Sequence, residues 1–218
     1  MAKFSTILFD LDGTITDPKS GITKSVAYAL DYLKIPYPSL DSLCVFIGPP
    51  LRDSFSDYGV KESDLGLAIE KYREYYIREN GIFDLKIYPG FADMLKRLKQ
   101  ADKKIILATC KTRIFAQDIL EHFSLARYFD FVSGSELDGT RITKGEVIAY
   151  ALEQTKTPVS SDVIMVGDRK HDIIGAKENH LQVASILYGY GTRAEFEAHH
   201  TDFILETVKD LEQFLLQE

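Results

Sequence analysis

Two carboxylates stand two residues apart directly after an apolar stretch near the start of the chain. The segment ILFDLDGTITD (residues 7–17) places Asp10 and Asp12 just ahead of a Gly13-Thr14 pair. Side chains alternate along a strand, so both carboxylates can face one point. Paired carboxylates repel each other, and a metal ion, a shared proton or a phosphoryl reaction would each account for them. A polar turn is the alternative, because Asp-Gly is a common turn dipeptide.

Other polar residues with useful chemistry follow later apolar stretches. Thr109 lies next to the end of the run KKIILATC, and Asp168 and Asp172 follow the run VIMV in VIMVGDRKHD. Lys144 opens the helix that leads into the second of these runs. Ligand sites of open parallel sheets lie beyond the carboxyl ends of the strands, which would bring these residues to one edge. Singly, Thr109 could be a helix cap, Lys144 a surface lysine, and the two aspartates a helix start.

The elements that would position these residues predict an α/β fold. Short β-type runs alternate with amphipathic segments, which favours right-handed crossovers and a Rossmann-like parallel sheet flanked by helices. The expected strands cover residues 4–9, 103–110, 129–134, 162–168 and 182–187.

The segment between the first two strands has a different pattern. Pro18 stands at a helix start, apolar residues then recur at helical spacing, and no strand of the main sheet is expected before Pro89. We therefore expect a helical insertion over residues 17–88, folded as a second small domain. The α/β core is expected to consist of residues 1–16 and 89–218.

Composition narrows the classes of function. The chain has 218 residues, a net charge of -7 and two cysteines. This acidic balance argues against nucleic acid as a partner, and the cysteines are too few for a disulfide framework. The sequence shows neither a signal-peptide core nor an apolar run long enough for a membrane span. We expect a cytoplasmic protein that does not associate with membranes. No feature of the sequence indicates an obligatory protein partner.

The motifs taken together resemble those of the haloacid-dehalogenase-like phosphohydrolase superfamily. The resemblance consists of FDLDGT near the N-terminus, a strand ending in Thr, a later Lys and then GDxxxD, in that order. It covers essentially the whole chain. The most similar branch carries a helical cap after the first strand and includes phosphoglycolate phosphatases, some 5′-nucleotidases and β-phosphoglucomutases.

This resemblance implies a role for each residue that would handle the phosphoryl group. Asp10 would be the nucleophile that forms an aspartyl-phosphate, and Asp12 the general acid and base. Thr109 and Lys144 would hold the phosphoryl oxygens. Gly13 would allow a sharp turn that brings backbone N–H groups near the phosphate.

The same resemblance implies Mg²⁺ as the cofactor. Its ligands would be Asp168, Asp10 and the main-chain carbonyl of Asp12. Asp172 would support the metal shell or Lys144. Hard oxygen ligands with open positions suit Mg²⁺, which binds phosphate oxygens.

The expected function is a Mg²⁺-dependent phosphatase for a small phosphorylated metabolite, similar to phosphoglycolate phosphatase. The alternatives are a 5′-nucleotidase-type nucleotidase, a β-phosphoglucomutase-like phosphomutase and, remotely, a phospho-acceptor signalling module. Arg52, on a turn defined by Gly-Pro-Pro, is our candidate for a cap residue that touches substrate, with a surface arginine as the alternative. Cys110 replaces an Asn frequent in relatives, and the sequence leaves its reactivity open.

Overall fold

The computed structural model describes residues 4–217 and divides into two compact units. One unit combines the chain up to Asp17 with the chain from Ile87 onward, and the other is Pro18–Lys86. Within the described residues, no helix has the length and apolar character to span a membrane.

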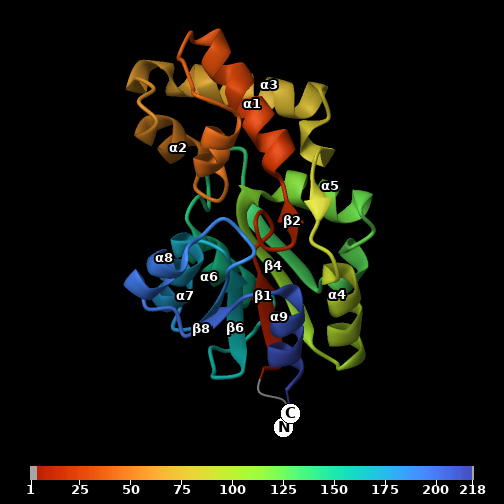
Figure 1. The fold of residues 1–218 in the computed structure, drawn as a ribbon. Coiled ribbons are helices and arrows are strands. Elements are labelled where there is room, and N and C mark those ends of the chain that lie inside the picture. Colours follow the sequence, from red (N-terminus) through yellow and green to blue (C-terminus); the bar gives the residue numbers. More distant parts are fainter. Residues whose placement is uncertain (1–3, 218) are drawn as a thin grey trace. The chain divides into compact units, whose positions relative to one another are not determined.

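A six-stranded sheet forms the centre of the first unit (Figure 1). The strand order is β5-β4-β1-β6-β7-β8, and all neighbouring strands pair in parallel. The strands are β1 (Thr6–Phe9), β4 (Lys104–Thr112), β5 (Phe131–Ser135), β6 (Val163–Gly167), β7 (Gln182–Ile186) and β8 (Phe203–Leu205). Two shorter strands, β2 (Thr16–Asp17) and β3 (Lys86–Ile87), make a separate pair.

Helices cover this sheet because its strands are apolar on both sides. Leu8 packs into the buried cluster formed with α6, α7 and α8, whereas the ring of Phe9 meets that of Phe91 on α4 at 5.4 Å. Adjacent strand residues point to opposite faces, so the two contacts identify helix layers on opposite sides of β1. The helices of this unit are α4 (Phe91–Gln100), α5 (Arg113–His122), α6 (Lys144–Gln154), α7 (Lys170–Glu178), α8 (Arg193–Ala198) and α9 (Val208–Leu216), with the 3₁₀ turn η4 (Ala126–Tyr128).

The second unit is helical. Tyr72 and Tyr76, both on the helix Leu65–Arg78, stack at 5.4 Å and are buried, so they pack the interior of this unit. Its elements are α1 (Lys19–Tyr32), η1 (Asp41–Phe46), α2 (Leu51–Asp57), η2 (Glu62–Asp64), α3 (Leu65–Arg78) and η3 (Gly81–Phe83).

The predicted fold class, a parallel α/β sheet with a helical insertion, is confirmed. Strand β8 was not predicted; it has only three residues and is half-buried. A strand this short shows no alternation from which it could be recognised.

Candidate active site

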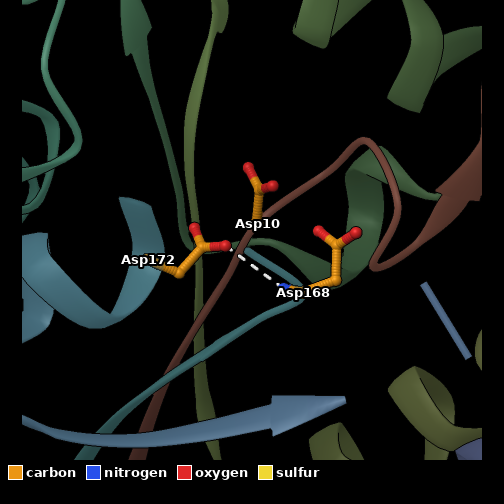
Figure 2. Close-up of side chains that lie close together, drawn as sticks. All are labelled: Asp10, Asp168 and Asp172. Atoms are coloured by element: carbon orange, nitrogen blue, oxygen red, sulfur yellow. Dashed lines mark hydrogen bonds between the residues drawn. The ribbon is translucent and has the colours of Figure 1, made fainter. Parts of the chain in front are cut away.

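Three buried aspartates meet at the carboxyl edge of the sheet. Asp10 follows β1, Asp168 follows β6, and Asp172 lies in the first turn of α7. One carboxylate oxygen from each lies within 4.8 Å of the others. Figure 2 shows the three side chains close together, with the hydrogen bond of 3.2 Å that the Asp168 N–H donates to Asp172 Oδ2. The parallel topology thus gathers carboxylates from two neighbouring strands.

Lys144 supplies the cation of this cluster. It opens α6, whose start is fixed by a capping box between Thr143 and Glu146. Its Nζ lies 2.6 Å from Asp10 Oδ1 and 2.8 Å from Asp172 Oδ1. Burial alone lowers the pKa of this ammonium, but the two carboxylates outweigh burial and raise it. Lys144 therefore remains charged and bridges two of the three acids.

Groups among the described residues offset the remaining negative charge only in part, through the Tyr190 N–H and the charge of Arg169. Burial, followed by repulsion from Asp172 and Asp10, raises the pKa of Asp168 well above its ordinary value. Burial also raises the pKa of Asp172 to about 6, against the opposing effect of Lys144. Among the described residues, nothing donates a hydrogen bond to the buried Asp168 Oδ1. An unpartnered carboxylate oxygen beside two further acids fits a hard metal ion.

Gly13 makes room for Asp168. Its φ of +89° lies in the left-handed region, and a Cβ atom at this position would lie 2.1 Å from Asp168 Oδ2. Only glycine satisfies both conditions. The backbone contact with phosphate expected of Gly13 stays a prediction, while the structure shows a steric need for this residue.

Asp12 has different neighbours from Asp10. Its Oδ2 lies 2.5 Å from Lys111 Nζ, and its Oδ1 accepts a hydrogen bond of 3.3 Å from Thr16 Oγ1. The Asp12 side chain is not part of the acidic cluster formed by the three buried aspartates. The expected metal ligand is its main-chain carbonyl, which these side-chain contacts do not test.

Thr109 is buried near the end of β4. Its Oγ1 accepts a hydrogen bond of 3.2 Å from the Lys111 N–H, which leaves the hydroxyl hydrogen for another acceptor. The Lys144 ammonium donates to the carbonyl of Ala108, one residue earlier, at 3.0 Å. The end of β4 and the start of α6 therefore lie together, as the sequence analysis expected.

Sequence reasoning missed a loop that follows β7, with the sequence Tyr-Gly-Tyr-Gly (Tyr188–Gly191). The Tyr190 N–H donates to Asp168 Oδ2 at 2.7 Å, and the Tyr188 hydroxyl donates to the carbonyl of Thr14 at 3.1 Å. A Cβ atom at Gly189 would lie 2.4 Å from Asp168 Cβ. Two glycines alternating with tyrosines directly after an expected strand were the available signal.

Arg52 and Cys110, the two other residues considered in the sequence, make contacts outside the cluster of aspartates. Arg52 lies on α2 of the helical unit, where its guanidinium is exposed and pairs with Glu62. Its contact with substrate stays a prediction. Cys110 is half-buried, and its carbonyl accepts a hydrogen bond of 2.9 Å from Ser135 Oγ.

The fold agrees with comparisons to known proteins. Residues 7–186 match the family model described as haloacid dehalogenase-like hydrolase. A 5′-nucleotidase from Pseudomonas aeruginosa is 38% identical over 214 residues, which cover 98% of this chain and 96% of the relative. The crystal structure of a predicted phosphatase from Clostridium acetobutylicum superimposes with a TM-score of 0.93 at 42% identity, over 98% of each chain.

The chain therefore belongs to the haloacid dehalogenase-like hydrolase family, and it is a phosphatase of that family. Of the two functions expected from the sequence, the alternative of a 5′-nucleotidase is better supported than a function similar to phosphoglycolate phosphatase. Phosphoglycolate phosphatase 1 from Pseudomonas aeruginosa is only 24% identical, over 94% of this chain and 77% of the relative.

Proposed function

We propose that this protein is a Mg²⁺-dependent phosphatase that hydrolyses small phosphate monoesters through an aspartyl-phosphate on Asp10. The observation that carries the proposal is the buried Lys144 ammonium, which lies 2.6 Å from Asp10 beside the cluster of buried aspartates. A carboxylate that attacks a phosphate dianion meets repulsion, and fixed cations at the site reduce it.

In the first displacement, a carboxylate oxygen of Asp10 forms a bond to phosphorus while the bond to the leaving oxygen breaks. Asp12 gives a proton to that leaving oxygen. In the second displacement, the oxygen of a water molecule bonds to phosphorus, the bond to Asp10 breaks, and the water proton passes to Asp12. Phosphate leaves, and both aspartates return to their starting states.

The remaining site residues would bind and orient the phosphoryl group and the metal ion. Thr109 has a hydroxyl hydrogen to donate to a phosphoryl oxygen, and Lys144 contributes positive charge. Asp10, Asp168 and the main-chain carbonyl of Asp12 would hold Mg²⁺, with Asp172 supporting Lys144 at 2.8 Å. Bound there, the ion neutralises phosphoryl charge.

Nucleoside 5′-monophosphates are the substrate class that we propose first. The support is the likeness to a 5′-nucleotidase along nearly the full length of both chains. We propose that the helical unit, residues 17–88, is the cap domain and selects the leaving group. Arg52 is the candidate residue for contact with that group. Phosphoglycolate and the mutase substrates use the same phosphoryl chemistry and belong in the same test.

A substrate panel tests this proposal. Purified protein with Mg²⁺ is given nucleoside 5′-monophosphates, phosphoglycolate and hexose phosphates, and released phosphate is measured. We expect release from the nucleotides, loss of release with excess chelator and none in Asp10→Asn. Undiminished release in Asp10→Asn would exclude the aspartyl-phosphate route, and an isomeric sugar phosphate without release would indicate a mutase.

A further inference from the structure

A second ammonium group lies at this edge of the sheet, and the roles proposed above do not use it. Lys111 Nζ is 2.5 Å from Asp12 Oδ2, and the two side chains are only 8% and 11% exposed. The site therefore contains two separate ion pairs, Asp10 with Lys144 and Asp12 with Lys111. Each of the two aspartates after β1 has a lysine of its own.

The backbone around Lys111 is shaped to place it there. Thr109 and Lys111 both lie on β4. The pairing of β4 with β5 shifts register between Ala108 and Thr112, and an irregularity of this kind can re-aim a side chain. Opposite them, a Cβ atom at Gly134 would lie 2.6 Å from the Lys111 carbonyl oxygen, so glycine is needed for the close approach.

Both oxygens of the Asp12 carboxylate are held by this arrangement. Lys111 contacts Oδ2, and the Thr16 hydroxyl lies 3.3 Å from Oδ1 and equally 3.3 Å from the Leu11 carbonyl oxygen. The Lys111 ammonium is therefore the stronger of the two contacts that orient the carboxylate. A general base must lie within hydrogen-bond reach of the proton that it accepts, so this orientation decides whether Asp12 can act on water.

We propose that Lys111 is a positioning residue that holds the Asp12 carboxylate to accept the proton of the attacking water in the second displacement. This inference rests on the proposed phosphatase function. The two lysines then have separate roles, because Lys144 contacts the nucleophile Asp10 and Lys111 contacts the base Asp12. Loss of Lys111 should slow hydrolysis of the aspartyl-phosphate and leave binding of the phosphoryl group intact.

The experiment compares Lys111→Met and Lys111→Arg with the wild type and with a matched control, Lys177→Met. Lys177 also forms an ion pair, with Asp202 at 2.8 Å, but its side chain is 42% exposed. With p-nitrophenyl phosphate, whose leaving group needs little protonation, we expect phosphate release by Lys111→Met to fall about 10²-fold. The phosphoryl group should accumulate on the peptide that contains Asp10. The inhibition constant of orthophosphate should stay unchanged, and Lys111→Arg should recover part of the rate.

A double-mutant cycle separates this role from a structural one. In an Asp12→Asn background, Lys111→Met should cause no further loss, because it acts through Asp12. Additive losses, or weaker binding of orthophosphate, would overturn the proposal and make Lys111 a phosphate ligand or a folding residue. If the wild-type protein hydrolyses no ester, the proposed function is wrong, and so is the role of Lys111 that rests on it. Hydrolysis by the wild type without accumulation in Lys111→Met would remove only the role of Lys111.

Discussion

At the scale of single residues, the two aspartates of the opening motif differ in what surrounds them. Asp10 shares Lys144 with Asp172, whereas Asp12 is held by Lys111 and Thr16. Identical side chains two residues apart can thus be given different tasks by their neighbours.

Substitution of each aspartate should therefore give a different result. Asp10→Asn removes the nucleophile, so neither phosphate release nor a covalent adduct is expected. Asp12→Asn keeps the nucleophile but loses the base, which typically costs about 10²–10⁴-fold in rate. With p-nitrophenyl phosphate, mass spectrometry should detect one phosphoryl group on the Asp10 peptide of Asp12→Asn and no such group in Asp10→Asn or the wild type. A label on another residue would show that the nucleophile is assigned wrongly.

The sequence could predict which residues meet but not how they pair. The edge shared by Asp10, Thr109, Lys144 and Asp168 follows from strand order in a parallel sheet. The ion pair of Asp12 with Lys111 depends on a register shift that a single sequence does not encode in any recognisable pattern.

At the scale of elements, the loop Tyr188–Gly191 contacts Asp168 of the acidic cluster. It contributes a backbone N–H to Asp168 and a tyrosine hydroxyl to the carbonyl of Thr14. Groups that orient ligands in this way commonly matter nearly as much as the ligands themselves. The loop was not predicted because its contacts come from backbone atoms, whose partners depend on the fold and not on residue type.

Gly189→Ala should weaken metal binding. The added Cβ would lie 2.4 Å from Asp168 Cβ and 2.5 Å from the Gly13 carbonyl oxygen, so the aspartate must shift. We expect the Mg²⁺ concentration for half-maximal activity to rise about 10–100-fold. Gly66→Ala is the matched control, because a Cβ there meets nothing within 4 Å. An equal metal requirement in both variants would show that the loop does not position Asp168.

At the scale of the whole molecule, an acidic protein with a net charge of -7 keeps three buried carboxylates together. One lysine bridges two of them, so burial of this charge lowers the stability of the folded, metal-free protein. The site therefore connects metal binding and pH to the stability of the α/β unit.

The sign of this pH dependence follows from the direction of the shifts. Burial raises the pKa of Asp168 and Asp172 above the value of the unfolded chain, so the folded state binds their protons more tightly. Their contribution to stability is complete below about pH 4. It is lost as the pH rises through the folded pKa, about 6 for Asp172. Mg²⁺ held by the ionised Asp168 and Asp10, as proposed above, should restore stability above that pH.

Thermal unfolding with and without Mg²⁺ at pH 5 and pH 7.5 tests this connection. At a concentration 100 times Kd, a ligand stabilises by about 2.7 kcal/mol, which raises Tm by roughly 5–10 °C for a chain of this size. We expect that rise at pH 7.5 and a much smaller one at pH 5, where protons compete with the metal. Asp168→Asn, which removes one of the two raised carboxylates, should lose most of the rise at pH 7.5. A rise that persists undiminished in Asp168→Asn would place the stabilising Mg²⁺ at another site.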